Sequence, residues 1–190
     1  MTAENSVVPF FEAQGYTLER RAAMLSGGAR LNFFSERIPI IDVFFDKLDY
    51  NHPIDYRGRL ELHPYCVSLA DLLLQKLQIV QINDKDLKDA MFLLLAGKVS
   101  GTDRDAVNGQ YIGKVLSEDW GFYYTATTNL GKIKDAMTKV DVLGAGERQT
   151  ISGRIDELSA LIEAAPKSGA WKRRAKVGAK KIWYKVVTDW

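Results

Sequence analysis

Two aspartates stand inside an otherwise apolar, strand-like stretch, IPIIDVFFDKLD, which covers residues 38–49. Side chains alternate between the two faces of a β-strand, so Asp42 and Asp46 are expected together on one face, opposite Ile41 and Val43. A carboxylate on such a face has two interpretations. It can lie on the solvated side of an antiparallel sheet, or it can hold a hard cation such as Mg²⁺, which prefers oxygen ligands. In the second interpretation the two aspartates could share one ion.

A lysine stands in the middle of an apolar arc in the segment SLADLLLQKLQIV, residues 68–80. At helical spacing Lys76 has Leu72, Leu73 and Val80 as its neighbours on that arc. A lysine is almost never fully buried without a partner. The ammonium therefore either reaches solvent along its aliphatic stem or meets a carboxylate or phosphate. If it meets an anion, we expect Lys76 to point toward the face that carries Asp42.

The next segment, NDKDLKDAMFLLLAG, places two further aspartates beside each other on one flank of a predicted helix. Asp86 stands three residues after Asn83, as in a capping box, which is a sufficient structural explanation for it. Asp89 has no such role, but an exposed aspartate on a helix needs none.

The last 24 residues combine cations with aromatic rings. They hold six Lys, two Arg and one Asp, a net charge of +7, whereas residues 1–166 carry a net −5. Cations neutralise phosphates and aromatic rings stack on bases, so one interpretation is a nucleic-acid contact. The other, which we favour, is a solvated basic helix whose aromatic residues pack on the rest of the protein. The candidate contact residues are Trp171, Lys172, Arg173, Arg174 and Lys176.

Cysteine and histidine are scarce in this chain. Cys66 is the only cysteine, and His52 and His63 are the only histidines. This excludes an intramolecular disulfide and a metal centre rich in Cys or His. No apolar run reaches the roughly 18 residues that a membrane span needs. The first residues lack the basic and apolar regions of a secretory signal. We therefore expect a cytoplasmic protein with no membrane partner.

The elements that must position these residues change character at Ser68. Before Ser68 the pattern predicts a short helix ending near Gly15 and a three-stranded antiparallel sheet. The sheet would use residues 16–25, 29–36 and 38–49, with turns at 26–28 and at Glu36-Arg37, and GRLELH (58–63) would add a short strand.

After Ser68 the pattern is helical. Capping signals and apolar periodicity predict helices, separated by a polar loop at 101–110; the helical stretches are 68–80, 83–97, 111–140 and 147–165. Strands first and helices afterwards predict the α+β class. We expect a partial sheet region at 1–66, a helical region packed on the sheet at 67–166, and a basic aromatic tail at 167–190.

The sequence from IDVFF to KDLKDAMFLLL resembles the nucleotidyltransferase-like proteins related to bacterial abortive-infection toxins, which have a polymerase-β type fold. The matching features are the strand aspartate Asp42, Lys76 in ADLLLQKLQIV, and the KDLKD motif. The resemblance covers most of the chain and is most specific at residues 38–96. It implies that Asp42 is a catalytic carboxylate that binds metal, that Lys76 is also catalytic, and that the motif residues Lys85, Asp86 and Asp89 bind the nucleotide.

The family's signature, a Gly-Ser turn followed by an Asp-x-Asp strand, does not stand upstream of Asp42. Two-metal phosphoryl transfer needs several carboxylates around ions roughly 3.5–4 Å apart. We therefore expect an incomplete site that binds Mg²⁺ weakly or not at all in this chain alone.

Three interpretations remain open. The chain is a non-catalytic or partner-dependent protein that binds a nucleotide or nucleic acid. Alternatively, it is an active, toxin-like enzyme that transfers a nucleotide to RNA or protein once a second chain or an N-terminal segment completes the site. In the third, it is a nucleic-acid-binding module in which the sheet is only a scaffold.

Overall fold

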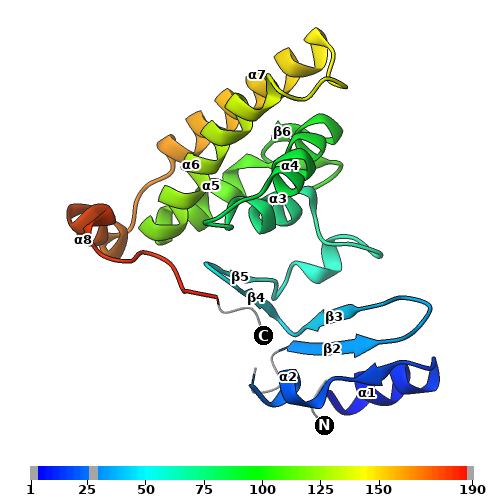
Figure 1. Cartoon of the computed structure of the whole chain (residues 1–190). Helices are drawn as coiled ribbons and strands as arrows, with labels where there is room; N and C mark the ends of the chain where they lie inside the picture. The colour runs from blue at the N-terminus through cyan, green and yellow to red at the C-terminus, as the bar shows by residue number, and fades with distance from the viewer. Residues whose placement is uncertain (1–3, 26–29, 188–190) are drawn as a thin grey trace. The chain divides into compact units, whose positions relative to one another are not determined.

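The structure is a computed structural model that describes residues 4–25 and 30–187 of the chain. The chain divides into two compact units, which we call the N-terminal unit (Met1–Leu48) and the helical unit (Asp49–Val187). A strand-containing first part is followed by a mainly helical second part, so the predicted α+β class is confirmed (Figure 1).

The N-terminal unit is built on a three-stranded antiparallel sheet in the order β1 (Thr17–Leu18), β2 (Arg30–Phe34) and β3 (Ile41–Phe44). Helices α1 (Glu4–Ala13) and α2 (Arg20–Leu25) accompany it. Its small core is centred on Leu31 and Phe33, which are fully buried, and the ring of Phe11 stacks on Phe33 at 4.5 Å between centroids. Alternation along β2 therefore directs Leu31 and Phe33 toward α1 and Asn32 toward the opposite face.

Three parts of the expected sheet differ from the observed one. Residues 16–25 form only a two-residue strand and then α2, because Arg-Arg-Ala-Ala-Met-Leu is a run of strong helix formers. The turn expected at 26–28 lies outside the described residues, whereas Glu36-Arg37 does lie in the connection between β2 and β3. The stretch 38–49 is not one strand, because β3 ends at Phe44 and β4 (Lys47–Asp49) follows a turn.

The helical unit holds most of the regular structure. Its helices are α3 (Leu69–Leu77), α4 (Asp84–Ala96), α5 (Gly109–Glu118), α6 (Trp120–Met137), α7 (Ala145–Ala164) and α8 (Gly169–Val177). Short 3₁₀ turns occur at η1 (Leu60–Leu62) and η2 (Gly178–Lys180), and β6 (Lys98–Ser100) pairs with β7 (Ala106–Asn108). The strand β4, which includes the last residues of the N-terminal unit, pairs with β5 (Pro53–Asp55). Among the described residues, no helix combines the length and the apolar character that a membrane crossing requires.

Capping residues set the helix boundaries as predicted. The side chains of Ser68 and Asn83 accept hydrogen bonds from the backbone N–H three residues later and so begin α3 and α4. Gly97 follows the last residue of α4. The helical stretch 111–140 is divided at Asp119, whose side chain caps α6. The buried leucines of α3 and the buried isoleucines of α7 then supply apolar sides for the core of this unit.

Two expectations for the loops were wrong. The stretch 58–63, expected as a short strand, contains the 3₁₀ turn η1 and joins none of the sheets formed by the described residues. The segment 101–110 is not entirely loop, because it contains β7 and the start of α5. β7 runs parallel to β6, and this pair buries Val99 and Val107.

Candidate functional site

Asp42 lies on the face of the N-terminal sheet opposite the apolar core. It stands directly across from Asn32 on β2, whose side-chain amide donates a hydrogen bond to the carboxylate. The guanidinium of Arg30 also donates to Asp42, at 3.1 Å, and about a third of the Asp42 side chain is exposed. This is the environment of a carboxylate on the solvated side of an antiparallel sheet. A cation would have to compete with Arg30 for it.

Asp46 is not on the same strand face as Asp42, so this part of the sequence prediction was wrong. β3 ends at Phe44, and Asp46 adopts a left-handed backbone with φ of 60° in the turn before β4. The period-2 argument fails there because a turn breaks the alternation. No cluster of three or more His, Cys, Asp or Glu side chains suited to a metal ion occurs in the part of the chain that the structure describes.

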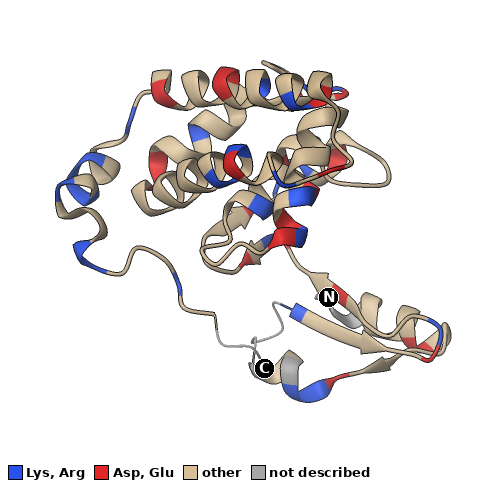
Figure 2. Ribbon diagram, turned by 45° about the horizontal axis from the view of Figure 1, so that its top comes forward, with Lys and Arg blue, Asp and Glu red and all other residues tan. Residues whose placement is uncertain are grey.

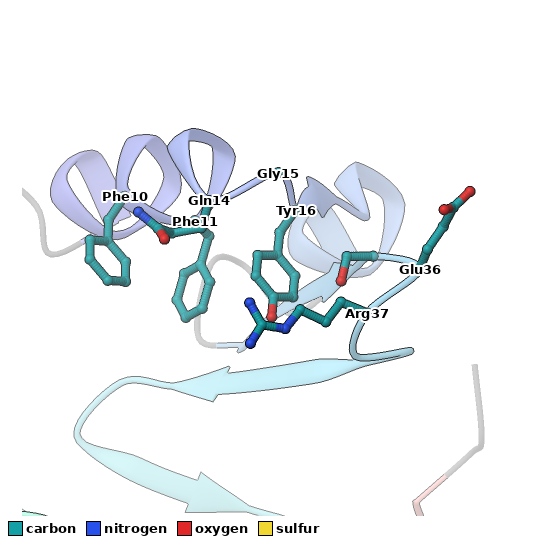
Figure 3. A pocket seen from close by; sticks show the side chains of 8 residues that line it. Phe10, Phe11, Gln14, Gly15, Tyr16, Glu36 and Arg37 are labelled. Carbon is teal, nitrogen blue, oxygen red and sulfur yellow. The ribbon is translucent and has the colours of Figure 1, made fainter.

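A hollow of about 520 Å³ opens in the N-terminal unit between the end of α1 and the connection from β2 to β3. Figure 3 shows the rings of Phe10, Phe11 and Tyr16 in a row along its wall, with the guanidinium of Arg37 beside Tyr16. Phe11 packs on Phe33, so this hollow is on the helix-covered side of the sheet. Asp42 projects from the other side, and the hollow is therefore separate from that carboxylate.

Lys76 meets its anions within the helical unit. Its ammonium lies 2.8 Å from a carboxylate oxygen of Asp86 and 2.8 Å from one of Asp89, both on α4. Burial by itself lowers the pKa of Lys76, but the hydrogen bonds to the two aspartates outweigh burial and raise it. The hydrogen bond from Lys76 likewise lowers the pKa of Asp89. The anion that the sequence pattern required is thus supplied by α4, and that pattern no longer requires Asp42 as the partner of Lys76.

Lys85 belongs to the same cluster but has a different exposure. It pairs with Asp89 at 3.2 Å one helical turn later, while 80% of its side chain remains exposed. Three residues of the KDLKD motif, Lys85, Asp86 and Asp89, therefore lie in one ion-pair cluster with Lys76. They form an ion-pair network that is complete without a ligand.

A buried charge network that the sequence analysis did not identify centres on Arg59. Its guanidinium donates to the fully buried Asp71 at 2.7 Å and to Asp103 at 2.7 Å, and lies 3.4 Å from the ring centroid of Tyr111. Burial alone disfavours the charged form of Asp103, but hydrogen bonds from Asn108 and Arg59 hold the pKa of this carboxyl below its usual value. Of these residues only Asp71 carries a sequence signal, because it stands three residues after Ser68, as in a capping box.

The C-terminal segment packs on α6 through its aromatic side chains. Trp171 contacts the ring of Tyr123 at 5.1 Å between centroids, and the guanidinium of Arg174 lies 4.9 Å above the ring of Trp120. Arg174 also donates hydrogen bonds to the carbonyl of Gly178, at 2.7 Å, and to other carbonyls that follow α8. These contacts agree with the interpretation that the aromatic residues of the tail pack on the rest of the protein. They place two of the proposed nucleic-acid contacts, Trp171 and Arg174, against α6.

The segment after η2 is linked to a buried histidine through the hydroxyl of Thr125. The indole N–H of Trp183 donates to the hydroxyl of Thr125 at 3.0 Å, and that hydroxyl lies 2.8 Å from Nε2 of His52. His52 is 1% exposed and its ring stacks on Phe122. Burial lowers the pKa of His52 to about 4, against a smaller opposing effect of Asp119. No role for His52 could be predicted from the sequence, because burial of a histidine in a loop has no local signature.

Comparisons of this chain with protein-family models, with curated proteins and with solved structures found no match.

Proposed function

We propose that this chain is a nucleotidyltransferase-like protein that is inactive by itself and acts together with carboxylates supplied from outside the described sheet. The observation that carries the proposal is the position of Asp42 on an edge strand. Within the described residues β3 pairs only with β2. An edge strand offers its remaining backbone N–H and C=O groups to a further strand. Carboxylates on an added strand, in register with Asp42, would lie directly beside it.

The charges around Asp42 support partner dependence over independent activity. Asp42 accepts hydrogen bonds from Arg30 and Asn32, so its charge is compensated within the chain. Mg²⁺ binds through carboxylates together with substrate phosphates and waters. Ligands from a partner strand and from a nucleotide would have to join Asp42. The lone cysteine supports the cytoplasm as the place where this function operates.

Lys85 and Lys76 differ in how readily each could contact a nucleotide. Lys85 offers a largely exposed ammonium, so it can contact a phosphate without losing a buried partner. Lys76 would first have to leave Asp86 and Asp89. We therefore propose that Lys85 contacts the nucleotide first. Lys76 would contact it only if a phosphate replaced Asp86 and Asp89 as its ion-pair partner.

The test is incorporation of label from α-labelled ribonucleoside triphosphates into RNA or protein, with Mg²⁺ or Mn²⁺ present. The purified chain should give none. A second chain that carries the Gly-Ser turn and the Asp-x-Asp strand should restore incorporation when mixed with it. Asp42→Asn should abolish the restored activity and Asp46→Asn should leave most of it, since Asp46 has left the strand. Transfer by the chain alone that depends on Asp42 would contradict the proposal.

A nucleic-acid-binding function is favoured by a separate observation, the excess of cations in the C-terminal segment. From Lys167 to Val187 the chain contains no Asp or Glu. Figure 2 shows Lys and Arg along α8 and the segment after it, with no acidic residue among them.

A further inference from the structure

The C-terminal segment has a packed side and an exposed side. The packed side carries Trp171 and Arg174, which contact α6. Ser168 fixes the start of α8, because its N–H donates to the carbonyl of Ser117 at 3.0 Å. At the other end, the backbone N–H of Lys185 donates to the carbonyl of Asn51, and the side-chain amide of Asn51 donates to the carbonyl of Lys185, both at 2.9 Å. The Lys185 ammonium pairs with Asp49 at 3.0 Å. The segment is therefore attached to the helical unit at both ends, and its orientation on that unit is defined.

The exposed side contains a group of cations, with the apolar side chains of Val177 and Ile182 exposed among them. We call this group the cationic face, and its residues are Lys172, Arg173, Lys176, Lys180 and Lys181, all of them exposed. None of the five has an acidic partner among the residues that the structure describes. Lys172 and Lys176 stand one helical turn apart, about 6 Å along the axis, and Arg173 lies beside them. The face is therefore a row of positive charges on an attached segment, without the carboxylates that pair with Lys76, Lys134 and Lys185.

We propose that the cationic face binds the phosphate backbone of single-stranded RNA, and that it does so without stacking a base on Trp171. Cations at this spacing can each neutralise a phosphate, which is the dominant source of affinity for nucleic acids. Base stacking needs an accessible ring. The Trp171 ring is occupied by Tyr123 and by the ammonium of Lys167, which lies 5.7 Å from its centroid. Binding should therefore be insensitive to base identity and steeply dependent on salt.

The geometry favours RNA over a membrane surface. A helix that lies on a membrane inserts an apolar side between the lipids while its cations contact the headgroups. In α8 the aromatic side is already packed on α6. Val177, at 36% exposed, is the large apolar residue that this helix leaves at the surface, whereas Ile182 and Val186 are exposed after the helix ends. That this RNA accepts a transferred nucleotide rests on the proposed function. That the cationic face binds RNA does not rest on it. The binding is measured without nucleotide or divalent metal, so either proposal can fail without the other.

The experiment is fluorescence anisotropy of end-labelled oligo(U) and oligo(A) titrated with the intact chain at several salt concentrations. Three to five phosphate contacts predict a log–log slope of roughly −2 to −3.5 for a single strand, equal for the two oligomers. The triple variant Lys172→Gln, Arg173→Gln, Lys176→Gln should weaken binding and reduce the magnitude of the slope by about 2.

The chain offers a matched control for that variant. Lys88, Lys132 and Lys139 are also exposed, lie outside the C-terminal segment, and have no acidic partner in the described part of the chain. Their replacement by Gln removes the same total charge and should leave the slope unchanged. Trp171→Leu keeps an apolar packing group and should leave the affinity unchanged. If the ring did stack on a base, this change would weaken binding by about five- to 150-fold at every salt concentration.

Four results would overturn the proposal. The first two are the absence of RNA binding at low salt and an equal loss of RNA affinity in the two triple variants. The other two are a large loss of RNA affinity in Trp171→Leu and displacement of the RNA by phosphatidylserine vesicles at matched charge concentration. The last result would assign the cationic face to a membrane surface.

Discussion

At the scale of single residues, burial fixes the charge state of His52. Its pKa of about 4 lies below the ordinary value of 6.5. The unfolded chain therefore binds this proton at a higher pH than the folded one, and stability is lost as the pH falls from about 6.5 toward 4. The loss attributable to His52 should reach at most about 3 kcal/mol. Urea unfolding between pH 7.5 and 4.5 measures it.

The second histidine is the control for that prediction. His63 lies in an exposed position. His63→Gln should retain the pH dependence of the free energy of unfolding, and His52→Gln, which keeps a polar group near Thr125, should reduce it. Equal slopes in all three proteins would mean that carboxylates alone cause the acid sensitivity.

The buried charge of Asp71 makes Arg59 a critical residue for stability. Arg59→Leu leaves a fully buried carboxylate without its counter-ion and should cost about 3–5 kcal/mol of unfolding free energy. Adding Asp71→Asn removes that charge and should restore part of the loss. Arg57→Leu removes the neighbouring ion pair with Asp55, which is largely exposed, and should cost less than about 1 kcal/mol. Similar losses for Arg57→Leu and Arg59→Leu would refute the argument.

Lys76 allows a structural role to be separated from a functional one. If its purpose is to pair with Asp86 and Asp89, Lys76→Met should destabilise the protein. Its coupling to Asp89→Asn in a double-mutant cycle should be about 0.5–1 kcal/mol. A neutral or stabilising Lys76→Met would instead indicate a lysine retained at a cost in stability, as expected for a group that binds a phosphate.

At the scale of elements, the contact between α6 and the segment after η2 depends on one glycine. A Cβ on Gly121 would clash with the carbonyl oxygen of Trp183, whereas a Cβ on Gly131 of the same helix would meet nothing within 4 Å. Gly121→Ala should therefore displace the segment and accelerate trypsin cleavage after Lys180 and Lys181. Gly131→Ala should leave cleavage unchanged and stabilise α6 by up to about 1 kcal/mol. Unchanged cleavage in Gly121→Ala would show that the segment does not need this close approach.

The elements that the sequence predicted well are those with local signals. Ser68 and Asn83 mark helix starts through hydrogen bonds to residues three positions away, so their effect can be read from neighbouring letters. The end of β3 after Phe44 could not be predicted, because no Gly or Pro marks it in the sequence. The candidate site divides in the same way. The cluster of Lys76 with the KDLKD motif joins adjacent helices, whereas Arg59 reaches Asp103 from 44 positions away, which no periodicity reveals.

At the scale of the whole molecule, the two units should differ in resistance to unfolding. The core cluster of the N-terminal unit has three buried members among the described residues, Ala23, Leu31 and Phe33. The helical unit buries apolar positions on α3 through α7. Amides of β2 should lose protection from hydrogen exchange at a lower urea concentration than amides of α6. Mass spectrometry of deuterated peptides resolves the two. Loss of protection in a single transition would indicate one cooperative unit.

The parallel pairing of β6 with β7 has a consequence for the order of folding. Parallel strands are normally joined by a crossover connection of a dozen or more residues, and closing such a long connection makes their assembly slow. Here Lys98 pairs with Ala106 and Val99 with Val107, so paired residues are eight positions apart along the chain. The loop to be closed is as short as that of many hairpins, and its entropy cost is correspondingly low. This sheet can therefore form before the distant helices meet, and it can serve as a local nucleus on which α3 and α5 assemble.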